Sequence, residues 1–274
     1  MRANLILGAG FLSRYLLSCV PQTTKSWMVN RSGFATGLRK NEELFKADIL
    51  ERRSLKEISS RIPDFDGYVF YFIPPSSFGV QAVISSLLPL FEVLDKGLIR
   101  GILVVSSTGV FSESNEETVN NTTCISGKTP RVERLLEIED VWLSSPFRVT
   151  IARLGGIYGK GRIIGASLLN HDEILPGTGN EYLNLIHGYD AARALLYMKK
   201  RTFSGKTFVV TDGNPIQRKV YYNYLADKLG RKRPIFSGHE RHSYKCDSQP
   251  TWKTLRINPK FGDYKIGLRD LIGR

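Results

Sequence analysis

The chain has 274 residues, of which 42% are hydrophobic and 24% charged, a composition typical of a globular protein. No apolar run approaches the roughly 20 residues that span a bilayer, and no signal peptide precedes the first glycine turn. Cys19, Cys124 and Cys246 are isolated and fit no C-x-x-C pair. These features argue against a membrane protein or a secreted one and predict a reduced, cytoplasmic setting.

The net charge of +13 is concentrated near the C-terminus, where residues 201–274 contain 16 Lys and Arg against 6 Asp and Glu. A basic surface for nucleic acid is one interpretation. A pocket for a phosphorylated or nucleotide-linked small molecule is the other, and we favour it. The only tight cluster, "GRKRP" at 230–234, follows a predicted helix, where cations are favourable anyway.

Short β-branched runs alternate with amphipathic stretches along the chain. This alternation predicts an α/β fold with a Rossmann-like, doubly wound parallel sheet. The predicted strands are 3–7, 26–30, 67–72, 101–106, 147–153 and 206–211. The predicted helices are 11–19, 77–97, 130–144 and a late helix that ends at Gly230.

Two stretches, 160–186 and 230–265, interrupt this alternation with Gly, Pro and polar residues. We therefore expect a dinucleotide-binding domain over 1–159, completed by about 187–212. A small substrate-binding annex is expected over 160–186 and 213–274.

The first predicted strand leads into "GAGFLSRYLL", which places Gly8, Gly10 and Ser13 in the G-x-G-x-x-G pattern. Gly8 permits a tight turn, Gly10 lets the backbone approach a pyrophosphate, and the helix N-terminus offers free N–H groups. Phe11 and Leu12 open that helix and are expected to contribute to cofactor binding. The position of the motif, after a strand and before a helix, predicts dinucleotide binding.

The second predicted strand ends at Asn30, Arg31 and Ser32 without the acid that binds a ribose 2′-hydroxyl in NAD-dependent proteins. Arg31 and Ser32 suit a 2′-phosphate instead, with Arg39 and Lys40 as further candidates. NADP(H) is therefore favoured over NAD(H). The alternative is that Arg31 is simply a solvated loop cation.

Several segments in order resemble the extended short-chain dehydrogenase/reductase family, the NAD(P)-dependent epimerases and dehydratases of nucleotide sugars. They include "VVSSTGVFS" at 104–112, "RLGGIYGKGR" at 153–162 and "NLIHGYDAARAL" at 184–195. The resemblance implies that Asp48 lies near the adenine and that Ile73 and Pro74 lie along the cofactor. It also makes a homodimer an expectation.

In that family a tyrosine acts as acid/base and a lysine one helical turn later lowers its pKa. Aligning Y-x-x-x-K-x-x-x-E with "TPRVERLLEIE" places Arg131 at the tyrosine, Leu135 at the lysine and Glu139 at the trailing acid. No tyrosine occurs from 112 to 157. A literal Y-x-x-x-K, Tyr224 to Lys228, lies in the late helix, and we regard it as coincidental.

Ser107 matches the catalytic Ser/Thr of the family, although a strand-end hydroxyl that satisfies backbone is the alternative. Tyr158 and Lys128 are the candidate replacements for the missing proton donor. Arg131 stays protonated at any ordinary pH and is instead a candidate anchor for phosphate or carboxylate. Thr108 and Asn184 complete the expected substrate-binding set.

The four histidines, His171, His187, His239 and His242, are dispersed, and no metal site is expected. Two functions remain open. The protein is an NADP(H)-dependent oxidoreductase or epimerase with an atypical site, or it is a non-catalytic NADP(H)-binding sensor or scaffold.

Overall fold

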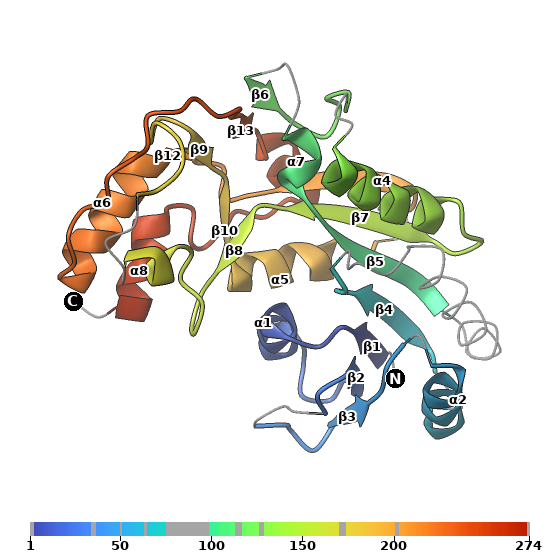
Figure 1. The fold of residues 1–274 in the computed structure, drawn as a ribbon. Coiled ribbons are helices and arrows are strands. Elements are labelled where there is room, and N and C mark those ends of the chain that lie inside the picture. The colour runs from blue at the N-terminus through green and yellow to red at the C-terminus, as the bar shows by residue number, and fades with distance from the viewer. Residues whose placement is uncertain are drawn as a thin grey trace. The chain divides into compact units, whose positions relative to one another are not determined.

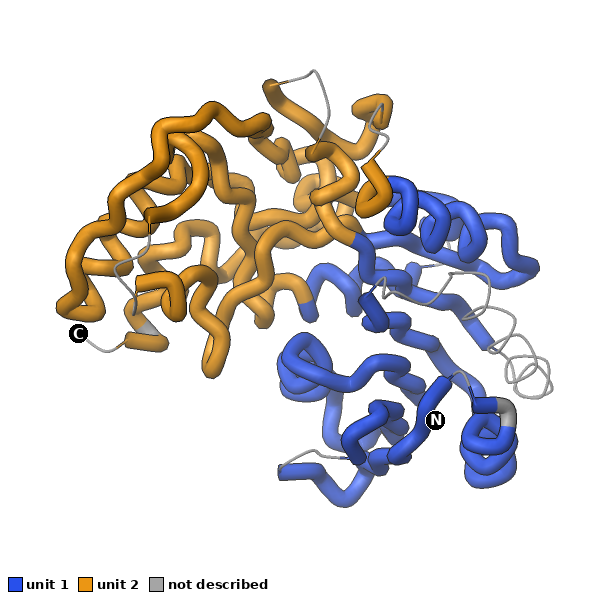
Figure 2. The backbone as a smooth tube through the Cα atoms, viewed as in Figure 1, with its two compact units in different colours: residues 1–106, 133–152, 192–207 blue, residues 107–132, 153–191, 208–274 orange. Residues whose placement is uncertain are grey.

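The computed structural model describes residues 3–33, 37–49, 51–62, 65–74, 99–112, 117–125, 129–169, 174–200 and 203–272. The predicted helix over 77–97 and the candidate Lys128 lie outside these residues. The chain divides into two compact units (Figure 2). Unit 1 comprises residues 1–106, 133–152 and 192–207, and unit 2 comprises residues 107–132, 153–191 and 208–274.

Seven strands form one sheet in the order β11-β7-β5-β4-β1-β2-β3 (Figure 1). β1 pairs in parallel with β2 and β4, β2 with β3, and β4 with β5. The predicted α/β fold with a doubly wound parallel sheet is thereby confirmed. The strands are β1 (Ala3–Leu7), β2 (Ser26–Asn30), β3 (Glu42–Lys46), β4 (Gly67–Tyr71), β5 (Ile99–Ser107), β7 (Val149–Leu154) and β11 (Lys206–Val210).

The strand order reverses between β1 and β4, which run side by side although β2 and β3 separate them in sequence. In open α/β sheets, ligands bind at the carboxyl ends of the strands beside such a reversal. All five residues of β1 and all six of β7 are buried, as expected for parallel strands with both faces covered.

The helices of the first half agree in part with the sequence prediction. α1 (Phe11–Cys19) has the predicted bounds, and α4 (Pro130–Leu143) ends one residue early. The strand β3 and the helix α2 (Arg52–Arg61) were not predicted. β3 has the sequence EELFK at the edge of the sheet, where polar side chains remain in contact with solvent.

Unit 2 contains short strand pairs and helices with an aromatic core. The pairs are β10 (Leu185–His187) with β8 (Gly156–Tyr158), β12 (Ile216–Gln217) with β9 (Tyr182–Leu183), and β13 (Lys245–Cys246) with β6 (Thr118–Val119). The helices are α6 (Arg218–Leu229), α7 (Gln249–Leu255) and α8 (Tyr264–Ile272), while α5 (Gly188–Tyr197) begins in this unit. Gly230 ends α6 with a left-handed φ of 61°, as predicted. The proposed domain and annex boundaries stay a prediction.

Candidate cofactor and substrate sites

The turn after β1 is built around two glycines with different constraints. Gly8 has a φ of +86°, and a Cβ there would lie 2.8 Å from the Ile73 side chain and 3.0 Å from the Ile73 nitrogen. At Gly10, which caps the N-terminus of α1, a Cβ would meet nothing closer than the Gly8 carbonyl oxygen at 3.9 Å. The fold itself therefore requires Gly8, whereas the space above Gly10 is open to a ligand.

The first turn of α1 suits an anion. It carries no acidic residue, so its free N–H groups keep their positive electrostatic character. Ser13, at the third glycine position, is buried and donates its hydroxyl to the Gly10 carbonyl at 2.7 Å. Phe11 is half-buried and Leu12 is buried, so the Leu12 side chain packs in the core and only its backbone remains for a cofactor.

The end of β2 is organised by Asn30. Its amide nitrogen donates to the Ala9 carbonyl at 3.2 Å, and its amide oxygen accepts from the Gly33 N–H at 2.7 Å. Ser32 donates its hydroxyl to the same oxygen at 3.2 Å. Asn30 and Ser32 therefore shape the loop, while Arg31 is exposed beside them.

The two remaining predicted cofactor contacts lie at strand ends. Asp48 is half-buried, two residues after β3, and Pro74 is exposed, three residues after β4. Ile73 lies against Gly8.

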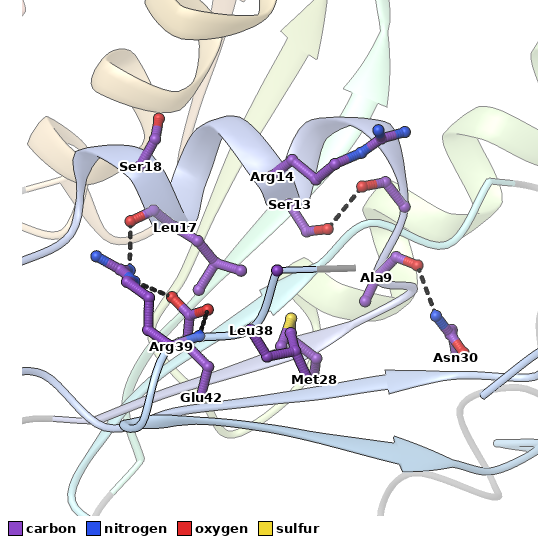
Figure 3. Close-up of a pocket in the computed structure, with 12 residues that line it drawn as sticks. Ala9, Ser13, Arg14, Leu17, Ser18, Met28, Asn30, Leu38, Arg39 and Glu42 are labelled. Carbon is purple, nitrogen blue, oxygen red and sulfur yellow. Dashed lines mark hydrogen bonds and ion pairs between the residues drawn. The ribbon is translucent and has the colours of Figure 1, made fainter. Parts of the chain in front are cut away.

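A cavity of about 430 Å³ opens beside the glycine turn (Figure 3). One face of α1 lines it with Gly10, Ser13, Arg14 and Leu17, and β2 and the segment 37–42 line the opposite side. Arg14 is exposed and forms no ion pair with any residue that the structure describes. The volume and the mixture of apolar walls and polar groups are those of a small-molecule site.

Arg39 also lines this cavity, but its guanidinium is already bonded to other groups of the protein. It pairs with Glu42 and donates to the carbonyl oxygen of Leu17 at 2.6 Å (Figure 3). It also donates to the carbonyl oxygen of Val20 at 3.3 Å. These contacts close the C-terminal end of α1 and neutralise the Glu42 carboxylate. Arg39 therefore has a structural role, and the suggestion that it assists a 2′-phosphate is not supported by its contacts.

The carboxyl end of β5 carries three consecutive hydroxyl side chains with different environments. Ser106 is buried and donates to the Glu139 carboxylate of α4 at 2.5 Å. Ser107 is half-buried, and its oxygen accepts the Gly109 N–H at 3.0 Å as the cap of a short 3-10 helix, Thr108–Phe111. Its own O–H has no acceptor among the described residues. Thr108 is buried, and the substrate contact predicted for it from sequence stays a prediction.

α4 stands where the catalytic helix was expected. Arg131 is exposed in its first turn, Leu135 is 4% exposed, and Glu139 is 2% exposed. Leu135, which the sequence comparison aligned with the lysine of the family motif, is therefore a packed aliphatic side chain.

Tyr158 is the second candidate proton donor. It is 1% exposed, its ring lies 5.2 Å from that of His187, and a Cβ at Gly267 would lie 2.4 Å from its hydroxyl oxygen. Burial, followed by the nearby Asp212 charge, raises the pKa of its phenol. This environment suits packing more than the proton transfer suggested by the sequence. His187 is likewise buried and accepts the Tyr189 N–H at 3.2 Å, a structural role.

A tyrosine that the sequence analysis did not single out lies beside the end of β5. The Tyr244 hydroxyl donates to the Thr108 carbonyl at 2.8 Å, and its ring lies 6.2 Å from that of Phe111. Tyr244 belongs to an irregular segment before β13, where no periodicity or motif marks it.

Asn184 positions that segment. Its amide nitrogen donates to the Tyr244 carbonyl at 3.0 Å, and its amide oxygen accepts the Cys246 N–H at 2.7 Å. Both ends of the side chain are thus bonded to backbone. The direct substrate contact predicted for Asn184 remains untested.

Among the described residues, no group of three or more His, Cys, Asp or Glu side chains could hold a metal ion. Within the same residues, no helix is both long and apolar enough to cross a membrane.

Comparison with known proteins shows which solved structures share this fold. No protein-family model and no curated protein matches the sequence. A protein of Methylobacillus flagellatus assigned as an NAD-dependent epimerase/dehydratase has 24% identity and a TM-score of 0.79, over 99% of this chain and 97% of that one.

Two further structures are similarly close in fold. The dTDP-glucose 4,6-dehydratase of Bacillus anthracis, in complex with NAD, has 16% identity and a TM-score of 0.80, over 99% and 96%. The UDP-glucose 4-epimerase of Thermotoga maritima, with UDP-glucose, has 18% identity and a TM-score of 0.77, over 98% and 97%. Over nearly its whole length, this chain has the α/β fold of these epimerase and dehydratase structures.

Proposed function

We propose that the protein binds NADP(H) and acts as an oxidoreductase or epimerase on a nucleotide sugar or a related phosphorylated ligand. The observation that carries the proposal is the cavity beside the Gly8–Gly10 turn, which Arg14 lines. The open space above Gly10 and the acid-free first turn of α1 fit a pyrophosphate.

The charges around the cavity favour a 2′-phosphate. Glu42 is the only acid among the cavity-lining residues that the structure describes, and Arg39 neutralises it. Asn30 stands where NAD-dependent proteins carry an acid, and its amide is bonded to the surrounding loop. Arg14 and Arg31 are both exposed. A dianionic phosphate is therefore attracted to this end of the sheet rather than repelled.

A bound nicotinamide would supply or accept a hydride, and the protein would supply binding, orientation and proton control. Ser107 is suited to hold the reacting oxygen because its O–H has no acceptor among the described residues. The basic C-terminal third, with 16 Lys and Arg over residues 201–274, suits a ligand that carries phosphate. A homodimer remains an expectation from the family resemblance.

One observation favours a second function, a non-catalytic NADP(H)-binding sensor or scaffold. Leu135 fills the lysine position of the expected motif and is packed at 4% exposure. Cofactor binding is common to both functions, so turnover separates them.

Fluorescence titration with NADPH and NADH tests cofactor binding. We expect tighter binding of NADPH, and we expect Arg14→Ala and Arg31→Ala to weaken it about tenfold to a hundredfold while NADH binding changes little. Arg53→Ala, an exposed cation on α2 away from the cavity, is the matched control. Equal affinity of the wild-type protein for both cofactors would remove the 2′-phosphate assignment.

A further inference from the structure

A cation-rich crevice lies in unit 1 where three neighbouring strands of the sheet, β11, β7 and β5, begin. The turn that follows α5 lies beside these strand ends and forms part of the crevice. The lining carries four cations and, among the described residues, no acid: Arg100, Arg148, Lys199 and Lys200. The Gly8–Gly10 turn follows the carboxyl end of β1, so this crevice and the cofactor cavity lie at opposite edges of the sheet.

Hydrogen bonds fix the elements that form the crevice relative to one another. The Ile102 N–H of β5 donates to the Arg148 carbonyl, directly before β7, at 2.8 Å. The Thr150 hydroxyl of β7 donates to the Phe203 carbonyl at 2.9 Å and so holds the turn that precedes β11. The cations are therefore carried by backbone that is already in place before any ligand binds.

The crevice is narrow at its floor. A Cβ at Gly101 would lie 3.3 Å from the Arg148 carbonyl oxygen and 3.6 Å from the Tyr68 ring, so a side chain at this position would narrow it further. The enclosed volume is about 10 Å³, which is room for one group the size of a water molecule. A ligand therefore places one small group in the crevice, and the rest of it stays at the surface.

The cations at the surface differ in how far the protein balances their charge. Arg100 pairs with Asp66, and its Nη2 donates to Oδ2 at 2.6 Å. Arg148 and Lys200 are exposed, and neither pairs with a carboxylate of the residues that the structure describes. Like charges gathered at one crevice raise the local positive potential, which attracts an anion.

Lys199 is the most enclosed of the lysines at this crevice. It is half-buried, its Nζ donates to the Asn4 Oδ1 at 3.4 Å, and its ammonium lies 4.8 Å from the centre of the Tyr68 ring. These neighbours are uncharged, so they orient the ammonium without cancelling its charge. A ligand in the crevice therefore meets a positioned cation as well as the two exposed ones.

A phosphate group matches this arrangement better than a carboxylate does. One phosphate oxygen can enter the narrow floor while the others face the exposed cations, and a planar guanidinium binds two such oxygens at once. A carboxylate has two oxygens and a single charge. We propose that the crevice binds the phosphate group of a phosphorylated small molecule, held by Arg148, Lys199 and Lys200. This site is separate from the proposed cofactor site and does not depend on it.

The test is a titration of the full chain with inorganic pyrophosphate, followed by NMR at the amides of Gly101 and Ser204. Both residues line the crevice, so their resonances report binding there and not at the cofactor cavity. We expect shifts that saturate. The double substitution Arg148→Gln/Lys200→Gln should raise the Kd about tenfold or more, because two charge-assisted contacts are lost. Both side chains are exposed, so the double variant should fold normally, which its melting temperature checks.

The matched control is Arg53→Gln/Lys56→Gln, which removes two exposed cations from α2. It changes the net charge equally and should leave the Kd within about twofold. Shifts that do not saturate, or equal Kd values for the two double variants, would overturn the site. A wild-type protein that binds no NADPH contradicts the proposed function alone and leaves this site unaffected.

Two further anions identify the source of the phosphate. A lower Kd for adenosine triphosphate than for pyrophosphate at the same amides assigns the phosphate to a nucleotide, and the reverse order assigns it to a smaller ligand. Either order supports the site. A hexaglutamate peptide that binds more tightly than both would overturn the phosphate assignment in favour of an acidic protein segment.

Discussion

Ser106 of β5 donates a hydrogen bond of 2.5 Å to the carboxylate of Glu139 on α4, and both side chains are buried. This contact fixes α4 against the strand that ends in Ser107. Leu135 lies one helical turn before Glu139 and shares its face. The contact thus explains why the Leu135 side chain packs into the protein.

Removing the Ser106 hydroxyl should destabilise the fold. Ser106→Ala leaves a buried carboxylate without one of its donors, and we expect the free energy of unfolding to fall by about 1–3 kcal/mol. Urea denaturation measures the change. Ser59→Ala, which removes an exposed hydroxyl on α2, is the control and should cost no more than about 0.5 kcal/mol. Equal effects of the two substitutions would contradict the importance of the buried contact.

The two glycines of the turn should respond differently to alanine. Gly8→Ala places a Cβ against Ile73 at a positive φ and should lower the free energy of unfolding by about 1–3 kcal/mol. Gly10→Ala has room in the protein itself, so its stability should be nearly unchanged. Its Cβ would occupy the space intended for the pyrophosphate, and NADPH affinity should fall about tenfold or more. If Gly10→Ala binds NADPH like the wild type, the cofactor does not lie over this turn.

Asp212 should make stability depend on pH. Its Oδ1 accepts the Asn214 N–H at 2.9 Å, and its Oδ2 is buried without a hydrogen-bond partner among the described residues. Burial, together with the nearby charges of Asp263 and Asp190, raises the pKa of Asp212 from 3.8 to about 8, although the hydrogen bond from the Asn214 backbone acts in the opposite direction.

Between these two pH values the unfolded chain is ionised at Asp212 while the folded chain is protonated, so folding takes up a proton. This contribution to stability is full below about pH 4 and is lost as the pH rises to about 8. Asp212→Asn should lack this pH-dependent contribution to stability. The measurement is the melting temperature of the wild type and of Asp212→Asn as a function of pH between about 4 and 8. If the two melting temperatures change with pH in parallel, Asp212 is ionised in the folded protein.

Loss of the Asn184 side chain should loosen the Tyr244–Cys246 segment. Asn184→Ala removes two hydrogen bonds to backbone, and we expect a loss of about 1–3 kcal/mol. Hydrogen exchange at the Cys246 amide should become faster, whereas Asn180→Ala, on an exposed loop, should leave it unchanged. Unaltered exchange in Asn184→Ala would show that other contacts hold the segment.

The strands of the central sheet were predictable because the residues of each strand themselves show the apolar pattern that a buried strand requires. Runs such as ANLIL in β1 and VTIARL in β7 are apolar since both faces of a parallel strand are covered. β3, with the sequence EELFK, was missed because an edge strand tolerates polar residues and depends on its pairing with β2. The glycine turn was also visible, because Gly8 is required by local backbone geometry and by Ile73.

The side-chain environments of the candidate sites were not predictable in the same way. Arg39 was a candidate for binding phosphate because it is a cation that follows the second predicted strand. Only the structure shows that its guanidinium is bonded to Glu42 and to the Leu17 carbonyl of α1. Tyr158 resembled a donor by its motif, and its burial excludes easy access.

The sequence by itself thus determined the alternation of strands and helices and the glycine turn, because each depends on neighbouring residues. Only the tertiary structure decided that Tyr244 meets Thr108 across 136 positions of sequence. The acceptor in that contact is a backbone carbonyl, which every residue possesses, so no residue type or spacing records it.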